Sequence, residues 1–286
     1  MADVPTWIGA DGDSYDLDGS AGVKVLRGVE GRGLPPVSTV ADELAGLDGS
    51  RPRLSRATER EVAVPVLVKG ASWWESVRTL ASLFDPRRGN GRLRWGDREL
   101  VCRYSEGLEL DESEGIAGSH QKAVLVFVAH DPLWRDVDPT VRTVGVDDVA
   151  FLSPDSETAW FPWETVAEDA LGEFEVDNDS DDQVWPVWTI QGPGSGALSL
   201  ENLTSGEVIE LASVSLLAGE QIVIDTRPEA KTATGPDGSN LWPDLSDDSE
   251  LWPLVRGAQK VKVLLEGASP GESSVRLEYR RRWLTV

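Results

Sequence analysis

The sequence predicts a mainly β protein built from two domains, and three observations lead to this prediction. Short apolar segments separated by turn residues recur through most of the chain, which is typical of β-sandwiches and barrels. A single stretch, residues 72–84, has the apolar spacing of an amphipathic helix. Two Asp-Pro breaks within residues 131–139 precede a shift in charge. We therefore expect a β-sandwich or split barrel with one helix over residues 1–135, and a β-sandwich over residues 140–286.

The strands of the first domain are predicted from alternation and turn residues. Residues 15–26 contain two short apolar runs around Gly19, which predict an opening strand pair. A longer strand is expected where valines alternate with other residues, at Val62, Val64, Val66 and Val68. Residues 93–101 predict a hairpin around Gly96-Asp97. Residues 124–128 are continuously apolar, which predicts a strand buried on both faces.

The helix over residues 72–84 has a start signal, an apolar face and a stop signal. Ser72 is the candidate N-cap, and Glu75 three residues later completes a capping-box pattern. Asp85-Pro86 ends the helix. Four apolar side chains share one helical face: Trp73, Val77, Leu80 and Phe84.

Residues 28–60 are rich in Gly, Pro, Arg and Ser, and the stretch is too long and polar for a plain hairpin turn. We interpret it as a long arm of the first domain. Its basic residues either form a solvated surface or contact an acidic neighbouring subunit, and both interpretations stay open. The interface candidates on this arm are Arg51, Arg53, Arg56 and Arg60.

The second domain is predicted as short strands punctuated by turns. Residues 177–182 form a heavily acidic loop whose alternating carboxylates match three ligands of a calcium loop. The downstream Gly and bidentate Glu of such a loop are missing, so a solvated loop is the favoured interpretation. The strands are expected at residues 184–190, 197–200, 207–211, 221–225, 260–265 and 275–279.

The formal net charge of −23 lies mostly in the second half, and no Lys or Arg occurs between Arg142 and Arg227. Such a surface repels phosphate backbones, which argues against a DNA-binding role. The dense basic site of this half is the run Arg280, Arg281 and Arg282. We expect these arginines to pair with acidic surface of their own domain or of a neighbouring subunit. Residues 274–283 are expected to form a surface-ending strand of the second domain.

Nothing in the sequence predicts catalysis, a cofactor or a metal site. The two histidines, His120 and His130, lie in different contexts and no Cys/His spacing suits zinc. Cys102 lies in an apolar strand and is interpreted as a small core residue. No pair of carboxylates is singled out for glycoside hydrolysis. No run of about 18 apolar residues occurs, so membrane insertion is not expected.

A series of short motifs in the second half occurs in one order. The series is Pro186-Val187-Trp188-Thr189-Ile190-Gln191-Gly192-Pro193, Asn202-Leu203-Thr204-Ser205-Gly206, Ala218-Gly219-Glu220 leading to Ile224-Asp225-Thr226, and Leu254-Val255-Arg256-Gly257. It resembles the carboxy-terminal domain of siphophage distal tail proteins. In the first half, the helix, the strand Gly91-Arg92-Leu93-Arg94-Trp95 and the segment from Phe127 to Trp134 resemble the ring domain of the same family.

The resemblance implies a structural virion protein rather than an enzyme. It implies a homohexameric ring at the distal end of a long non-contractile tail, with a ring domain and a galectin-like β-sandwich. Implied partners are other copies of the chain, the tail tube, tail-tip hub and tape measure proteins, and fibre or receptor-binding proteins. DNA would only pass through an acidic lumen. The implied location is the virion tail tip, after assembly in the host cytoplasm.

The tryptophans leave a second interpretation open. Four of them lie in Pro-flanked, loop-like contexts: Trp160, Trp163, Trp242 and Trp252. They either fill the core or a subunit interface, or they stack on sugar rings, as a galectin-like domain would allow. The alternatives to a tail component are thus a carbohydrate-binding β-sandwich module and, less favoured, a glycoside hydrolase.

Overall fold

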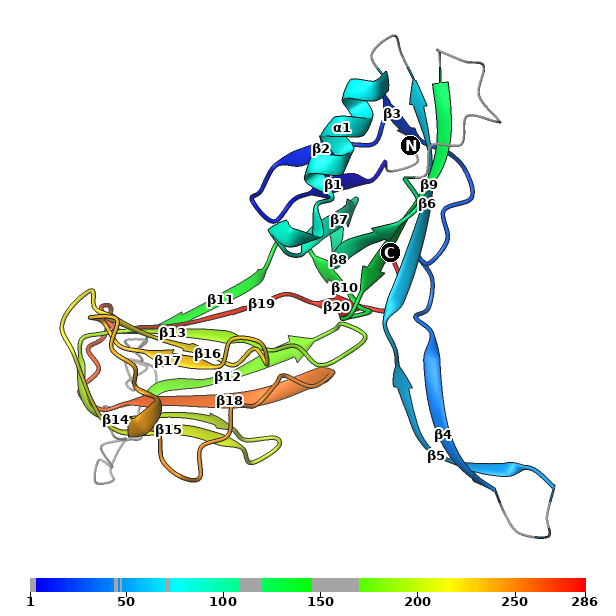
Figure 1. Cartoon of the computed structure of the whole chain (residues 1–286). Coiled ribbons are helices and arrows are strands. Elements are labelled where there is room, and N and C mark those ends of the chain that lie inside the picture. The colour runs from blue at the N-terminus through cyan, green and yellow to red at the C-terminus, as the bar shows by residue number, and fades with distance from the viewer. Residues whose placement is uncertain (1–3, 44–45, 47, 70–72, 109–119, 146–169) are drawn as a thin grey trace, which may run out of the picture. The chain divides into compact units, whose positions relative to one another are not determined.

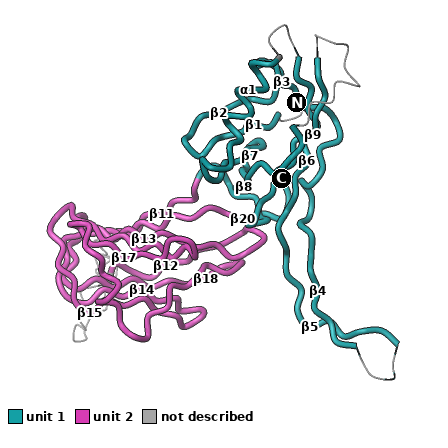
Figure 2. Tube along the Cα trace, in the orientation of Figure 1, with its two compact units in different colours: residues 1–138, 282–286 teal, residues 139–281 magenta. Residues whose placement is uncertain are grey.

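The computed structural model describes residues 4–43, 46, 48–69, 73–108, 120–145 and 170–286. The chain forms two compact units, which Figure 2 shows in different colours. Unit 1 contains residues 1–138 and 282–286, and unit 2 contains residues 139–281. From the sequence we expect the last five residues in the second domain. The structure places them in unit 1 because they pair with a strand of that unit.

Unit 1 is built on one strongly curved antiparallel sheet with the strand order β2-β1-β7-β8-β9-β6-β3 (Figure 1). Outside this order, β10 pairs with the first residues of β8 and with β20. The bounds are β1 (Thr6–Ile8), β2 (Ser14–Asp16), β3 (Val23–Val25), β6 (Arg60–Lys69), β7 (Gly91–Trp95), β8 (Arg98–Glu106), β9 (His120–Ala129), β10 (Trp134–Asp136) and β20 (Arg282–Trp283).

The helix α1 (Trp73–Leu83) packs against one face of this sheet. Its apolar spacing is confirmed at Val77, Leu80 and Phe84, which are all buried, whereas the side chain of Trp73 lies outside what the structure describes. The Phe84 ring lies 5.2 Å from the Trp7 ring and 5.4 Å from the Phe127 ring, both edge-on. The N-cap candidate Ser72 lies outside the described residues. The short η1 helix (Pro86–Arg88) follows, with Asp85 as its cap.

The predicted alternation in β6 is confirmed, since all four of its alternating valines are fully buried. The hairpin around Gly96-Asp97 is confirmed as the β7–β8 turn. The prediction that residues 124–128 are buried on both faces is wrong. Leu125 and Phe127 are buried, but Val124 is 46% exposed because the outer face of β9 is only partly covered within the described part of unit 1.

Residues 28–60 contain a long two-stranded hairpin, β4 (Val37–Glu43) and β5 (Ser50–Ala57), rather than an irregular loop. Its strands pair only with each other and leave the main sheet as a separate ribbon, visible in blue in Figure 1. A register shift between Val40 and Ala41 adds one residue to β5 opposite β4. We call β4–β5 the arm, and residues 30–36 the arm root.

Unit 2 is a β-sandwich of two antiparallel sheets, with strand orders β11-β19-β13-β16-β17 and β12-β18-β14-β15. Every strand expected from the turn spacing is present. The bounds are β11 (Thr140–Gly145), β12 (Ala170–Asn178), β13 (Val187–Gln191), β14 (Gly194–Asn202), β15 (Val208–Leu216), β16 (Gln221–Asp225), β17 (Thr232–Thr234), β18 (Gly257–Leu265) and β19 (Ser274–Tyr279), with the short η2 helix at Trp242–Asp244. The predicted fold class is therefore confirmed.

The core of unit 2 contains inward-facing residues of both sheets. At its centre the rings of Trp188 and Trp252 pack edge to face with centroids 5.3 Å apart. In β19, Val275, Leu277 and Tyr279 are buried while Arg276 is exposed, as the alternation predicted. Among the described residues, no helix is both long enough and apolar enough to span a membrane.

Candidate interaction surfaces

The arm is exposed on both of its faces. All eight residues of β5 and six of the seven residues of β4 are exposed. Its apolar side chains are uncovered as well, with Val37 64%, Val40 57% and Leu54 58% exposed. An isolated two-stranded hairpin is at best marginally stable in water. A hairpin of this kind therefore has the exposed apolar surface of an element that becomes buried when a partner binds it.

The contacts that hold the arm together are local. The hydroxyls of Thr39 and Ser55 lie 2.9 Å apart across the strands. The guanidinium of Arg53 lies 2.5 Å from the Asp42 carboxylate, and both side chains are largely exposed. Exposed ion pairs of this type contribute only about 0–1 kcal/mol. The exposed Arg51 and Arg56 also lie on the arm, so three of the four predicted interface arginines are available to a partner.

Arg60, the fourth candidate, is not available, and the prediction is wrong for this residue. Its side chain is only 1% exposed, because Arg60 is the first residue of β6 and faces the interior of unit 1. Its guanidinium donates to the carbonyls of Gly31 at 2.9 Å, Gly33 at 2.7 Å and Leu284 at 2.7 Å. Burial lowers the pKa of Arg60.

The basic cluster at residues 280–282 is divided between the two units. Arg281 binds Asp179 at 3.1 Å, which confirms the expected pairing with the Lys- and Arg-free stretch of its own domain. Arg282 instead binds Asp131 of unit 1 at 2.6 Å, and both of these side chains are mostly buried. Sequence reasoning did not anticipate this second pairing.

Asp131 is the centre of a small charged network. It also accepts a bond from Arg135 at 2.8 Å. Burial raises the pKa of the Asp131 carboxyl, but the guanidiniums of Arg282 and Arg135 outweigh that effect and hold its pKa below the usual value. The carboxylate therefore stays ionised over the physiological pH range and keeps both arginines in place.

The acidic loop at residues 177–182 is a hydrogen-bonded turn. The Asn178 amide donates to the carbonyls of Asp182 and Leu254, both at 2.9 Å, and the Ser180 hydroxyl donates to the Asn178 side-chain oxygen at 2.6 Å. Within the described ranges, no group of three or more His, Cys, Asp or Glu side chains could hold a metal ion. Cys102 is buried as expected, and burial raises its pKa to about 12.

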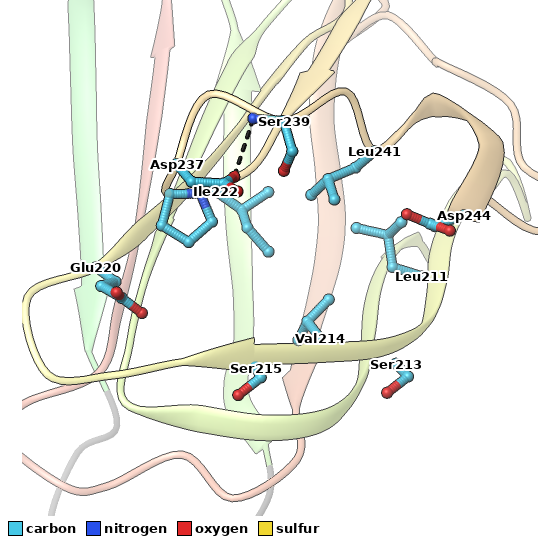
Figure 3. Close-up of a pocket in the computed structure, with 11 residues that line it drawn as sticks. Leu211, Ser213, Val214, Ser215, Glu220, Ile222, Asp237, Ser239, Leu241 and Asp244 are labelled. Atoms are coloured by element: carbon cyan, nitrogen blue, oxygen red, sulfur yellow. Dashed lines mark hydrogen bonds between the residues drawn. The ribbon is translucent and has the colours of Figure 1, made fainter.

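One hollow of about 440 Å³ lies on unit 2, beside β15, β16 and the loop before η2 (Figure 3). Its floor is apolar, with Val214 and Ile222 in Figure 3 pointing into it. The rim is polar and carries Glu220, Asp237 and Asp244. Serine hydroxyls lie between these carboxylates, but no aromatic side chain lines the hollow.

The tryptophans proposed to contact a partner or a sugar have different positions. Trp252 is 1% exposed and belongs to the core of unit 2, so its ring is not available to a ligand. Trp242 is 45% exposed and stays a surface candidate. Trp160 and Trp163 lie outside the described residues. The Pro-flanked context of Trp252 suggested an exposed loop. The residue is buried because an isolated bridge between Leu254 and Val184, which are distant in the sequence, holds this segment against the core.

Comparison with known proteins agrees with this architecture. Residues 179–283 match the family model described as siphovirus-type tail component, C-terminal domain. The fold is similar to the crystal structure of the Dit protein of phage SPP1, described as a paradigm of the hub adsorption apparatus in phages that infect Gram-positive bacteria. That match has a TM-score of 0.69 and 15% identity, and covers 98% of this chain and 99% of the other.

A chain of the phage p2 baseplate in its activated conformation with Ca matches with a TM-score of 0.59 and 12% identity, over 100% of both chains. A search of curated protein sequences finds no match. The family match covers most of unit 2, and the structural matches extend the same fold to unit 1. The resemblance of the chain to siphophage distal tail proteins is therefore confirmed by a family match over residues 179–283 and by a shared fold over both units.

Proposed function

We propose that this protein is a structural component of a phage tail that assembles into a closed ring of six copies at the distal end of a long non-contractile tail. The ring would join the tail tube to the tail-tip hub. The observation that carries this proposal is the arm, a hairpin with both faces exposed on an otherwise well-packed unit. The family match in unit 2 and the fold shared with a hub adsorption protein support it.

A ring follows from an arm that contacts the next copy. Such a contact joins two different surfaces, so each copy offers one arm and receives one, and repetition closes a ring if the rotation allows. The exposed Val37, Val40 and Leu54 supply apolar area for this contact, and Arg51 and Arg56 supply charge. Burying the arm would also cover the open edges of β4 and β5, which otherwise invite nonspecific pairing.

The charge of the chain suits a passage for DNA better than a binding site for it. From residue 137 onward the sequence has 10 Lys and Arg against 28 Asp and Glu. Such a negative surface repels the phosphate backbone, so DNA would pass through the ring without binding to unit 2. The tail tube, hub and tape measure proteins are the proposed neighbours of the ring, and fibre or receptor-binding proteins would attach to unit 2.

The carbohydrate-binding alternative is less well supported by unit 2. Sugar sites commonly present an aromatic face for stacking, but the hollow on this unit has no aromatic lining. Of the tryptophans considered for this role, Trp252 is in the core. We therefore infer that unit 2 serves protein contacts within the tail.

Excision of the arm tests the proposal. The Thr58 amide donates to the Pro36 carbonyl at 2.9 Å, so these two residues are already spaced as the ends of a β-turn. Replacing residues 37–57 by Asn-Gly would close this turn and leave the arm root intact. The wild-type chain is expected to give six-copy rings by native mass spectrometry and negative-stain microscopy. The excised chain is expected to stay monomeric.

Two controls keep this experiment interpretable. Circular dichroism and thermal unfolding should show that the excised chain is folded, because the arm contributes nothing to either core. A chain with Arg78→Lys, a change on the exposed side of α1 and away from the arm, should still form rings. Six-copy rings of the folded, excised chain would contradict the proposal that the arm makes the ring contact.

A further inference from the structure

Three segments that are distant in the sequence meet at the buried guanidinium of Arg60. Gly31 and Gly33 belong to the arm root, and Leu284 follows β20. One nitrogen of the fork, Nη1, donates to both glycine carbonyls, while Nη2 donates to Leu284. A single side chain therefore ties residues 282–286 to the position where the chain turns into the arm.

This cation depends on backbone carbonyls for its stability. Among the described residues, no ion pair joins Arg60 to a carboxylate, and its Nε has no hydrogen-bond partner. The Trp134 ring lies 5.9 Å away and adds a weaker cation–π contact. A buried charge without a counter-ion is costly unless its hydrogen bonds are all made. Losing any one carbonyl should therefore destabilise the position of the others.

Residues 282–286 are held to unit 1 by several further contacts. β20 pairs with β10, with Trp283 opposite Trp134. The Trp283 indole donates to Asp136 at 2.7 Å, and Arg98 lies over the same ring at 4.4 Å while also donating to the Thr285 carbonyl. The backbone N–H of Val286 donates to the carbonyl of Arg32, in the arm root, at 3.3 Å.

We propose that residues 282–286 are a clasp that fixes the arm root through Arg60, so that the arm is correctly directed only when this segment is in place. The clasp lies after unit 2 in the chain, whereas the root it holds lies before it. A chain that has not yet made the segment after unit 2 would then have a loose arm and would not enter a ring. The effect on assembly rests on the function proposed above, whereas the effect on the arm root does not.

Hydrogen exchange of the arm root in the monomeric chain tests the clasp directly. Exchange is measured by mass spectrometry on peptides covering residues 30–36, in which the Glu30 amide, donating to the Ala63 carbonyl at 3.0 Å, is the protected reporter. The measurement is made at a dilution where native mass spectrometry shows only monomers. A chain ending at Arg281 removes the clasp. Arg60→Lys keeps the charge but replaces the planar fork by a single ammonium, which cannot reach all three carbonyls.

The matched control is Arg56→Lys, the same chemical change on the exposed arm. Peptides from β18 in unit 2 serve as the internal reference for an intact fold. Loss of a charge-assisted hydrogen bond corresponds to a change in opening equilibrium on the order of tenfold or more. We expect exchange at residues 30–36 to accelerate by about that factor in the truncated chain and in Arg60→Lys, and to be unchanged in Arg56→Lys.

Combining the two clasp changes distinguishes a shared mechanism from two independent losses. Arg60 keeps its bonds to Gly31 and Gly33 in the truncated chain, so if Leu284 holds the guanidinium in place, the combined acceleration should be smaller than the product of the two single accelerations. Purely additive effects would contradict the proposed route through Arg60. Unchanged exchange of the arm root in Arg60→Lys would overturn the clasp itself, even if the truncated chain were to misfold.

Ring assembly gives the second readout. Both clasp variants should form fewer rings than the wild-type chain at equal concentration. Equal ring yields would overturn the role of the clasp in assembly. If the wild-type chain itself formed no rings, the proposed function would fail while the exchange result would still decide whether the clasp holds the arm root.

Discussion

Unit 1 contains two long antiparallel strand pairs whose surroundings differ completely. β6 and β9 are both ten residues long and bury alternate side chains against α1 and the rest of the sheet. The arm strands β4 and β5, seven and eight residues long, bury none of their residues. The backbone ladder is of the same kind in both pairs, so hydrogen bonding alone does not explain why each is stable.

The difference shows where the stability of a strand pair comes from. In β6 each buried valine removes apolar surface from water, which contributes about 1.5–3 kcal/mol per fully buried side chain. The arm has cross-strand contacts worth only tenths of a kcal/mol to about 1 kcal/mol each. The folded chain therefore stabilises β6–β9 by itself, whereas the arm needs burial that another molecule supplies.

The largest expected loss of stability follows from a substitution in the core that packs against β6 and β9. Phe84→Ala removes a ring that packs against Trp7, Tyr104 and Phe127. We expect a loss of about 3–5 kcal/mol in the free energy of unfolding of unit 1, because a large buried side chain leaves a cavity. Urea unfolding of the monomer measures it. An unchanged midpoint would show that α1 does not depend on this face.

A matched pair of substitutions compares the two strand pairs directly. Val64→Thr places a hydroxyl in the core, where an unpaired polar group costs about 1–3 kcal/mol. Val40→Thr makes the same change on the exposed arm and should alter the stability of the monomer by less than about 0.5 kcal/mol. Equal losses in urea unfolding would show that the arm is packed within its own chain.

A smaller effect is expected at the basic cluster. Arg282→Ser breaks a mostly buried pair with Asp131 and should cost about 1–2 kcal/mol, whereas Arg281→Ser breaks an exposed pair with Asp179 and should cost about 0–1 kcal/mol. Thermal unfolding at low and high salt measures both. The reverse order would mean that Asp131 does not anchor β20.

The smallest effect is a pH dependence centred on Asp131. Its pKa is lower in the folded chain than the unfolded value of about 3.9, so its stabilising contribution is fully present above that pH. The contribution is lost as the pH falls through the folded-state pKa. Wild-type unit 1 should therefore lose stability below about pH 4 more steeply than Asp131→Asn. Parallel pH profiles of stability for the two chains would show that the ionised Asp131 does not stabilise unit 1.

The contrast between the strand pairs also explains what the sequence could predict. The alternating valines of β6, the face of α1 and the turns of unit 2 are local patterns that follow from one-sided burial. The arm has no buried face and therefore no alternation, so the sequence indicated only a long polar segment. β9 was assigned two buried faces because Val124 is apolar, yet Val124 is exposed.

The residues that sequence reasoning misplaced depend on long-range topology. Arg60 lies four residues after Arg56 and is chemically identical to it, but Arg60 starts a core strand and is buried. Trp283 and Leu284 return to unit 1 through the pairing of β20 with β10 and through contacts to Arg60 and Asp136, all far away in the sequence. The apolar pair after three arginines was the one local sign that residues 282–286 form a separate element.

Hydrogen exchange of the arm at low and high protein concentration tests whether another copy of the chain covers the arm. Peptides covering β4 and β5 are followed in dilute monomer and in concentrated, assembled protein, with peptides from β6 as the internal reference. We predict rapid exchange of the arm in the monomer and protection by about 100-fold or more in the assembly, with β6 protected in both. An arm that is already protected in the monomer, or that stays unprotected in the assembly, would contradict this prediction.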